Sequence, residues 1–484
     1  MKRFKIPGIT LLIFCSISAS SQNLPNIVFI LADDFGYGSV NCYGADESLV
    51  RTPHINHIAE QGMRFTNAYT PASICSPTRY GFLTGRYPWR SALKFGVMNV
   101  CDTLLIDPDR ITIADYLKQQ GYNTAAIGKW HLGYGNVQDH DYTGTLSPGP
   151  LDLGFDYHFA VPQNHDDMTG VYIENDQVYG LRSKELHPYS KSFYGKQYMG
   201  LDAPQRVNVD VMDDLTGKTV EWIRKQNEQT PFFIYFGAVA VHHPITPSEY
   251  MRGMSGCGPY GDFIQDMDRC VGKIIEALSY KGFLGNTIII FTSDNGGDIP
   301  YNDPLRPETS AMNAGLKSNG ILRGDKHTIY EGGSRVPFIV SWPGVIEENS
   351  YSDDLISLLD VFATLGDIIM KPLPEKNKEI APDSYSFYPS LTQTKGKGKR
   401  GSLVYADANG MHAIRSGDWK YIDDTPPDNL PGERKARLQK DFKTQLYNLN
   451  SDPSEEKNLI DENPDKFISL SKQLDKIRMS PSSR

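Results

Sequence analysis

The sequence predicts an α/β protein built on a large, mostly parallel β-sheet. Three short apolar runs, at residues 26–32, 231–237 and 286–293, are rich in strand-forming residues and too short for a typical helix. Polar residues follow the first and third runs at once and the second run a few residues later, at His242, as they do at the edge of an open α/β sheet where ligands bind. Stretches with helical periodicity separate the runs, and they predict the helices that flank the sheet.

The length and composition allow one large domain and a smaller one. The chain has 484 residues, of which 39% are hydrophobic and 22% are charged, as in an ordinary globular protein. We place the larger domain at residues 24–375 and the smaller one at residues 376–484. The formal net charge of −9 argues against general affinity for nucleic acid or for anionic membranes.

The N-terminal segment, residues 1–21, has the pattern of a secretory signal peptide. It combines a basic start, a central apolar run and small residues at its end. The apolar run is too short to span a bilayer, and we find no other candidate for a transmembrane segment. We therefore expect an exported protein, either periplasmic or extracellular. Cys15 leaves open a surface lipoprotein, although the bulky Phe14 stands where such a signal has a small residue.

Oxygen-bearing side chains follow the first and third apolar runs. Asp33 and Asp34 come directly after the first run, and Asp294 and Asn295 come directly after the third. A single aspartate at a strand end could equally cap the next helix. Four such residues at two distant strand ends instead suit a hard cation that prefers oxygen ligands, calcium or magnesium.

A potential nucleophile lies among arginines at residues 75–86. Cys75 is followed by Pro77 and Arg79, and Arg86 closes the stretch. An arbitrary cysteine in such a setting is more often an inert buried residue. Fixed positive charges beside a nucleophile suit an anionic substrate.

Two further predicted strand ends carry basic side chains. A short strand at residues 123–128 leads into Lys129 and His131, and the second apolar run leads into His242. Lys326 lies in a Gly-rich polar stretch ahead of another short apolar run. Taken singly, each of these is a weak signal, since a lysine at such a place is ordinarily exposed and a histidine packed.

Together these stretches resemble the signatures of type I sulfatases, which depend on formylglycine and belong to the alkaline phosphatase superfamily. They read C-S-P-T-R with L-T-G-R, then G-K-W-H-L-G, H-H-P, and R-G-D-K with E-G-G-S-R-V-P. The resemblance is to bacterial arylsulfatases and carbohydrate sulfatases and spans about residues 25–460. It implies an alkaline-phosphatase-like fold, in which helices flank a large mixed, mostly parallel sheet and a smaller C-terminal α+β domain contains an antiparallel sheet.

The resemblance also implies an activity, the hydrolysis of sulfate esters. In such enzymes the cysteine is oxidised to formylglycine (3-oxoalanine), whose hydrate attacks sulfur and forms a covalent sulfo-enzyme intermediate. The resemblance implies Ca²⁺, with Mg²⁺ less favoured, held by Asp33, Asp34, Cys75, Asp294 and Asn295. It implies a catalytic sulfate pocket formed by Cys75, Arg79, Lys129, His131, His242 and Lys326.

By the same resemblance, the pocket residues divide the chemistry among them. Arg79, Lys129 and Lys326 surround the sulfate with positive charge. Lys326 and His242 protonate the leaving oxygen. His131 takes a proton from the second hydroxyl of the hydrate, so that the covalent sulfate is expelled.

Sugar recognition is assigned to a long segment without clear periodicity, residues 134–205. Loops of this length in a compact domain are usually functional or mobile. We name His165 and Asp166 as candidate contacts to sugar hydroxyls, since this region resembles the part of carbohydrate sulfatases that binds substrate. Ordinary solvated loop residues are an equally good interpretation of the pair.

The C-terminal part has a different character. We expect a helix at residues 355–369 and an exposed basic loop at residues 395–400. Short strands joined by turns predict a small antiparallel sheet. These strands are at residues 402–405, 411–416, 419–422 and 445–448. The final stretch up to about residue 460 is again typical of sulfatases.

The cysteine count is consistent with this interpretation. The chain has six cysteines; loss of Cys15 with the signal leaves five, and conversion of Cys75 leaves four. Those four could form disulfides in an oxidising compartment, with Cys257 and Cys270 the nearest pair in sequence.

The expected partners are a sulfated carbohydrate and a formylglycine-generating or anaerobic sulfatase-maturing enzyme. Two alternatives stay open. One is a phosphonate monoester or phosphodiester hydrolase on the same fold, since some of these also use formylglycine. The other is a catalytically silent homologue that binds glycans.

Overall fold

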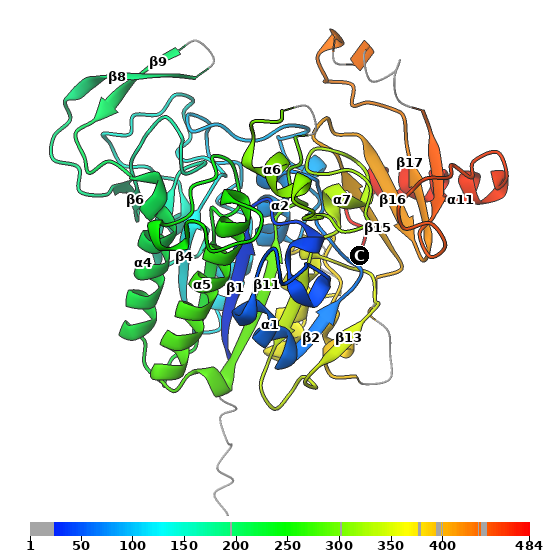
Figure 1. Ribbon diagram of the computed structural model, residues 1–484, viewed down its shortest axis with the longest axis horizontal. Helices are drawn as coiled ribbons and strands as arrows, with labels where there is room; N and C mark the ends of the chain where they lie inside the picture. The colour runs from blue at the N-terminus through cyan, green and yellow to red at the C-terminus, as the bar shows by residue number, and fades with distance from the viewer. Residues whose placement is uncertain are drawn as a thin grey trace, which may run out of the picture.

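A computed structural model gives the fold of the chain (Figure 1). It describes residues 24–484 except positions 194–195, 301–302, 376–378, 394–397, 399, 434 and 437–442. The predicted signal peptide, residues 1–21, lies outside the described residues. In the described part of the chain, none of the helices combines the length and the apolar composition that crossing a membrane requires.

The centre of the molecule is a ten-stranded sheet with the order β13-β2-β12-β11-β1-β10-β4-β5-β6-β7. Strand β1 (Asn26–Ala32) pairs in parallel with β11 (Thr287–Ser293) and β10 (Phe232–Gly237). Strand β4 (Asn123–Lys129) lies parallel to β10, and β5 (Tyr157–Val161) lies parallel to β4. The continuous burial of these strands explains why they appear as unbroken apolar runs.

Shorter strands make the sheet mixed at both edges. Strand β12 (Phe338–Ser341) runs antiparallel to β11, and β2 (Gly62–Phe65) runs antiparallel to β12. The predicted mixed, mostly parallel α/β fold is therefore confirmed. The remaining edge strands and a separate two-stranded pair are β13 (Ser350–Ser352), β6 (Ile173–Glu174), β7 (Gln177–Val178), β3 (Ala68–Tyr69) and β14 (Ile356–Ser357).

Alternate residues of β1 enter two different hydrophobic cores. Ile27 and Phe29 pack with one layer of helices, whereas Val28 and Ile30 pack with the other. The first layer contains α2 (Cys75–Thr84), α3 (Ile113–Lys118) and α8 (Val361–Ile368). The second contains α1 (Pro53–Glu60), α4 (Val211–Lys225) and α5 (Pro259–Tyr280), of which α4 and α5 run side by side (Figure 1).

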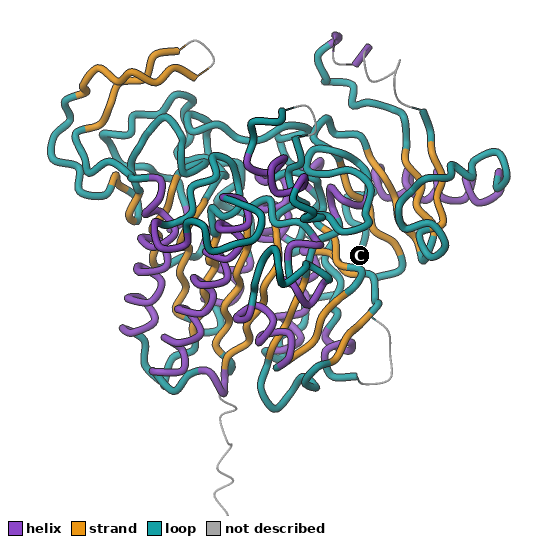
Figure 2. Tube along the Cα trace, viewed as in Figure 1, coloured by secondary structure: helices purple, strands orange, loops and turns teal. Residues whose placement is uncertain are grey.

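A second sheet follows in the C-terminal part and stands beside the first (Figure 2). Its order is β15-β16-β17-β18 and all its pairs are antiparallel, as predicted. Helix α11 (Pro464–Met479), which the sequence analysis did not identify, packs Leu470 and Leu474 against it. The four strands are β15 (Ser402–Ala406), β16 (His412–Ser416), β17 (Trp419–Ile422) and β18 (Gln445–Asn448). The domain boundary at residues 375 and 376 stays a prediction.

Three expectations about loops and helix bounds are wrong. The stretch at 134–205 contains β5 and a hairpin of β8 (Leu186–Phe193) and β9 (Lys196–Leu201). The helix expected at 355–369 begins only at Val361, since Ser357 and Asp360 form a capping box around a preceding 3₁₀ turn. Of the run at 395–400 the structure describes only Gly398 and Arg400, and Arg400 is not exposed, because it is buried in an ion pair with Asp360.

The disulfide expectation also fails where the structure can test it. Cys257 and Cys270 are free thiols, and among the described residues neither is joined to another cysteine. The remaining short helices are α6 (Pro307–Asn313), α7 (Glu331–Ser334) and α9 (Tyr388–Leu391). The 3₁₀ turns are η1 (Tyr37–Ser39), η2 (Asn41–Tyr43), η3 (Pro88–Arg90), η4 (Pro150–Leu153), η5 (Asn208–Asp210), η6 (Glu249–Met251), η7 (Leu284–Asn286) and η8 (Leu358–Asp360).

Candidate active site

The carboxyl ends of neighbouring parallel strands bring the predicted site residues to one edge of the large sheet. Asp33 and Asp34 follow β1, while Asp294 and Asn295 follow β11, its direct neighbour. Lys129 is the last residue of β4, on the other side of β10. Two strands distant in sequence thus supply the acidic side chains, and a third supplies a cation.

Cys75 lies at the N-terminus of α2, against these strand ends. Its Sγ is 3.6 Å from Asp33 Oδ1 and 3.6 Å from Lys129 Nζ. Pro77 is tolerated because it falls in the first turn of the helix. The helix ends at Gly85, whose left-handed φ of 57° closes its last turn. The stretch from Cys75 to Gly85 therefore forms one short, fully buried helix together with its C-terminal cap.

Four ligand atoms form a compact cluster suited to a metal ion. One atom each from Asp33, Asp34, Cys75 and Asp294 lies within 4.8 Å of all the others. Asn295 donates from Nδ2 to Asp34 Oδ1 over 2.8 Å, and its buried Oδ1 has no hydrogen-bond partner among the described residues. Three buried carboxylates beside an unused amide oxygen fit a divalent cation that prefers oxygen ligands.

Three cationic side chains face the same carboxylates. Arg79 donates from Nε and Nη2 to Asp294 Oδ2, over 3.0 and 2.7 Å. Lys129 Nζ is 2.7 Å from Asp33 Oδ2, and Lys326 Nζ is 2.7 Å from Asp34 Oδ2. The protein thus supplies positive charge at one point from α2, from β4 and from the loop ahead of α7, which is a setting for an anion.

The buried charges shift one another's pKa values. Burial opposes ionisation of Asp34, but Lys326, His242 and Lys129 together hold its pKa well below the ordinary value. Burial and the charge of Asp33 raise the pKa of Asp294 to about 6. The desolvation of Lys326 is outweighed by Asp34, so the pKa of its ammonium group lies well above the ordinary value. Lys326 is therefore a protonated group at neutral pH.

Cys75 is a poor nucleophile as a plain thiol. Burial, reinforced by the charge of Asp294, raises the pKa of the thiol well above its ordinary value, although Lys129 and Lys326 act in the opposite direction. The thiolate, not the thiol, is the reactive form of cysteine. The surroundings of Cys75 therefore do not activate it in the way that a thiol enzyme would require.

His131 is held as a neutral base. Its Nε2 is 3.0 Å from the backbone oxygen of Met98, which can only accept, so Nε2 carries the proton. Its buried Nδ1 has no partner in the described part of the chain and keeps a lone pair. Burial and the charges of Lys129 and Arg79 place the pKa of His131 well below its ordinary value.

His242 also lies at this edge. Its Nε2 is 3.9 Å from Asp34 Oδ2, and its Nδ1 contacts the backbone oxygen of His243. Burial and the charge of Lys326 lower the pKa of His242 well below the ordinary value. All the positions predicted for the metal and the sulfate pocket are therefore in or beside one cluster.

The two candidate sugar contacts lie outside that cluster. His165 is buried and its Nε2 is 2.9 Å from the backbone oxygen of Pro244, while its Nδ1 has no partner among the described residues. Burial and the nearby charge of His242 lower the pKa of His165. Asp166 is only half-buried. Contact of either residue with a sugar stays a prediction.

Two contributors were not identified from the sequence. The backbone of Met98 accepts from His131 and also from Gln163 Nε2 over 3.1 Å, and its N–H donates to Ser76 Oγ over 3.1 Å. Tyr235, in β10, accepts from Arg79 Nη1 over 3.2 Å. A backbone carbonyl leaves no mark in a side-chain pattern, and Tyr235 resembles any other residue of an apolar strand.

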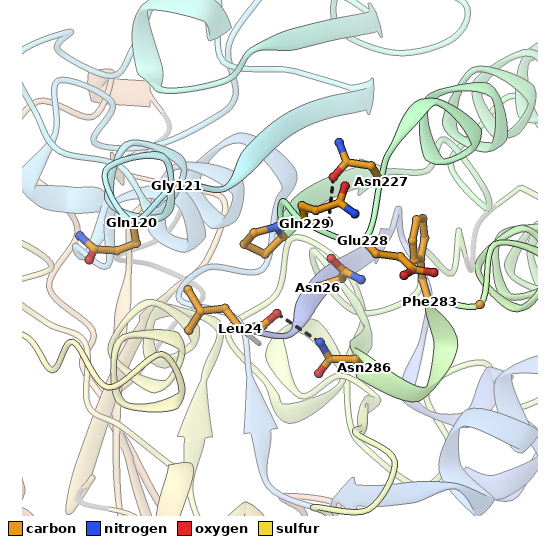
Figure 3. A pocket seen from close by; sticks show the side chains of 11 residues that line it. Leu24, Asn26, Gln120, Gly121, Asn227, Glu228, Gln229, Phe283 and Asn286 are labelled. Carbon is orange, nitrogen blue, oxygen red and sulfur yellow. Dashed lines mark hydrogen bonds between the residues drawn. The ribbon is translucent and has the colours of Figure 1, made fainter. Parts of the chain in front are cut away.

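A pocket of about 570 Å³ lies at the opposite edge of the sheet (Figure 3). Asn26 at the start of β1, Pro231 ahead of β10 and Asn286 ahead of β11 contribute to its wall, and Asn286 donates to the backbone oxygen of Leu24. It contains none of the predicted site residues. This pocket is thus separate from the cluster of reactive groups.

The site can be compared with known proteins. A family model described as Sulfatase matches residues 25–369. N-acetylgalactosamine-6-O-sulfatase of Bacteroides thetaiotaomicron is 35% identical over 512 residues, covering 98% of each chain. Arylsulfatase A of Bos taurus is 31% identical over 477 residues, covering 94% of this chain and 86% of that one. A solved Bacteroides thetaiotaomicron structure, described under the metabolism of multiple glycosaminoglycans, superposes with a TM-score of 0.84 and 34% identity, covering 95% of this chain and all of the other.

Proposed function

Because this chain belongs to the sulfatase family and is a sulfuric ester hydrolase, we propose that it removes an O-sulfate group from a sugar of a sulfated glycan. The first candidate is the 6-O-sulfate of N-acetylgalactosamine, the group named for the bacterial relative. The observation that carries the proposal is the cluster itself. Cys75 meets three carboxylates and three cationic side chains at one sheet edge.

The nucleophile of this proposal is formylglycine, made from Cys75 by a separate maturing enzyme. The raised pKa of the thiol argues against direct attack by sulfur. An aldehyde at this position takes up water and then carries two hydroxyl groups. One hydroxyl gives its proton to the carboxylate of Asp33, whose Oδ1 lies 3.6 Å from Cys75 Sγ, and its oxygen forms a bond to the sulfur of the substrate while the ester S–O bond breaks.

Arg79, Lys129 and Lys326 stabilise the charge that develops on the sulfate during this step. All three are buried side chains that contact carboxylates of the site, so they are already held in place when the substrate arrives. The leaving alkoxide takes a proton from Lys326, which is protonated at neutral pH. His242, whose lowered pKa keeps it neutral, lies beside the same carboxylate of Asp34. General acid catalysis of this kind contributes roughly 10²–10⁴-fold.

Release of the covalent sulfate uses the second hydroxyl. His131 Nδ1 has a free lone pair and the lowered pKa of a neutral base, so it takes the proton of that hydroxyl. The carbon–oxygen double bond forms again as the bond from carbon to the sulfate oxygen breaks. Sulfate departs and the aldehyde is restored, which a serine or a cysteine could not achieve.

A divalent cation belongs to the same proposal, with Ca²⁺ favoured over Mg²⁺ by the family. When bound, such an ion would act as a Lewis acid and lower the pKa of a hydroxyl group that it holds. The residues that would hold it are Asp33, Asp34, the modified Cys75, Asp294 and Asn295.

The direct test joins mass spectrometry with a substrate panel. Protein made together with a sulfatase-maturing enzyme is digested, and the peptide that contains Cys75 is examined for the mass of the aldehyde. The same preparation is assayed on matched sulfate and phosphate esters of one alcohol and on 6-O-sulfated N-acetylgalactosamine. Conversion with preference for sulfate supports the proposal. Preference for phosphate would indicate a phosphohydrolase, and glycan binding with an unconverted thiol would indicate a silent homologue.

An exported location also belongs to the proposal, either periplasmic or extracellular. A sulfated polysaccharide is met outside the cytoplasm, and the N-terminal pattern of residues 1–21 is that of a signal peptide. N-terminal sequencing of the mature protein after cell fractionation tests this, and retention of residues 1–21 on a cytoplasmic protein would contradict it.

A further inference from the structure

The loop that carries Lys326 is closed at its base. The N–H of Gly332 donates to the backbone oxygen of Arg323 over 2.7 Å, so residues 323–332 form one closed loop. We call this segment the Lys326 loop. Its first stem is Arg323 and its second stem ends at Glu331, the first residue of α7. Any group that fixes both stems also fixes where Lys326 enters the site.

Glu455 holds both stems at once. Its backbone oxygen accepts from Arg323 Nη1 over 2.7 Å, and its Oε2 accepts from the backbone N–H of Glu331 over 2.7 Å. Its own N–H donates to the backbone oxygen of Asp452 over 3.2 Å. Glu455 is completely buried. It comes from the final sulfatase-like stretch, to which the proposed chemistry gives no role.

Lys420, on β17 of the C-terminal sheet, supplies the positive charge beside the buried carboxylate of Glu455. Its Nζ is 2.6 Å from Glu455 Oε1 and 3.2 Å from Glu331 Oε1, and all three residues are completely buried. Tyr405 on β15 donates to Glu331 Oε1 over 3.0 Å, and Tyr69 donates to Glu331 Oε2. A buried ion pair of this kind often adds little net stability, and its value can lie in the position that it fixes.

Backbone hydrogen bonds extend the same connection toward Cys75. His327, next to Lys326, donates from its N–H to the backbone oxygen of Ser73 over 2.9 Å. Ser73 in turn donates to the backbone oxygen of Ala406, the last residue of β15, over 2.9 Å. Ser73 lies two residues before Cys75. Figure 1 shows α7 close to β15, where these segments meet.

We propose that Lys420 and Glu455 are positioning residues through which the C-terminal sheet sets the place of Lys326 relative to Cys75. The inference rests on the proposed function, in which Lys326 binds the sulfate and protonates the leaving oxygen. Lys420 and Glu455 themselves touch no reacting atom. We call the group Glu331, Lys420 and Glu455 the clamp.

The test is a double-mutant cycle between the clamp and Lys326. Turnover per folded molecule is measured for K420M, K326A and the double variant, on an aryl sulfate and on a sugar sulfate. E455Q is a milder second clamp variant if K420M does not fold. The matched control is R400M, because Arg400 makes an equally buried ion pair of 2.6 Å with Asp360 away from the Lys326 loop.

If the clamp acts through Lys326, K420M loses activity on the same ester as K326A does, but to a smaller extent. We expect kcat to fall about tenfold on the sugar sulfate, whose alkoxide is a poor leaving group, and about threefold or less on the aryl sulfate. The double variant K420M/K326A then loses no more activity than K326A alone. The control R400M keeps wild-type turnover per folded molecule, so R400M/K326A has the same activity as K326A.

Two results would overturn the inference: full turnover of folded K420M and E455Q, or additive losses in the double variant. Failure of the proposed function has a different signature. If K326A loses equal activity on both esters, Lys326 is not the acid. The clamp is then still tested by two results. K420M should lower activity on the two esters in the same proportion as K326A, and the double variant should lose no more activity than K326A.

Discussion

The molecule contains two clusters of buried charge that are similar in composition and differ in how completely they are satisfied. At the sheet edge, three carboxylates meet three cationic side chains, yet Asn295 Oδ1 and His131 Nδ1 have no partner in the described part of the chain. In the clamp, both oxygens of Glu331 have hydrogen-bond partners, from Lys420, Tyr405 and Tyr69. Glu455 Oε1 has no hydrogen-bond partner among the described residues, but it forms an ion pair with Lys420 over 2.6 Å. Unpaired polar atoms beside clustered ligand atoms mark the first cluster as a site for chemistry, and ion pairing of both carboxylates marks the second as a support.

The largest effect should come from the nucleophile. A Cys75→Ser variant whose serine stays unconverted has only one oxygen at this position and cannot expel the covalent sulfate. We expect kcat on an aryl sulfate to fall by at least about 10³-fold, with little change in Tm. Peptide mass spectrometry must accompany the assay, to show that the serine is intact. Equal turnover by this variant and by modified wild-type protein would refute the formylglycine mechanism.

The clamp should respond chiefly in stability. K420M leaves Glu455 without its cation and leaves Glu331 with only the more distant Arg335 and Arg415. Breaking such a buried pair costs about 3–5 kcal/mol in the free energy of unfolding. K326M should cost about 1 kcal/mol or less when Ca²⁺ is present, because the ion can replace the lost ammonium beside Asp34. Urea denaturation of both variants with Ca²⁺ measures the difference. Equal losses would mean that the two clusters respond alike to the loss of a cation.

Added Ca²⁺ should also distinguish variants in the two clusters. Ca²⁺ at about 100 times its Kd stabilises a folded protein by about 2.7 kcal/mol, so wild-type Tm should rise when the ion is added and fall when it is chelated. D34N and D294N should lose this shift because each removes a charged ligand from the cluster. R400M should keep it. An unchanged shift in D34N would place the ion elsewhere.

Much of the large sheet and its edge could be predicted because the determining features are local. A run such as residues 26–32 is continuously apolar since both faces of β1 are buried, and Asp33 follows the strand in sequence as well as in space. The long helix α4 is equally local in origin, because its apolar residues recur at regular helical spacing and enter the core. The gathering of Asp34 and Asp294 then follows from parallel pairing.

What could not be predicted depends on partners that are distant in sequence. Arg400 belongs to a basic run, and only its pairing with Asp360 explains its burial. Strand β5 is a five-residue segment among glycines and aspartates, and it is stabilised by its place beside β4. Glu455 resembles any acidic residue of a surface turn until the folded chain places Lys420 against it. Local patterns carry no information about such pairings.

The smallest predicted effect is a pH dependence that belongs to the clamp. Burial raises the pKa of Glu455 to about 7, while Lys420 holds the pKa of Glu331 at about 2 although burial opposes it. The unfolded chain has an ordinary glutamate pKa near 4.5. Between about pH 4.5 and pH 7 the folded protein therefore binds more protons at Glu455 than the unfolded chain does, so this residue makes stability fall as pH rises through that window.

We expect this contribution to amount to about 1–3 kcal/mol across the window. Comparing the free energy of unfolding of wild type and E455Q at several pH values measures it, because glutamine does not titrate. The wild-type curve should fall relative to that of E455Q toward pH 7, and R400M should follow the wild type. Parallel curves for wild type and E455Q would show that Glu455 stays ionised in the fold, with Lys420 outweighing the cost of burial.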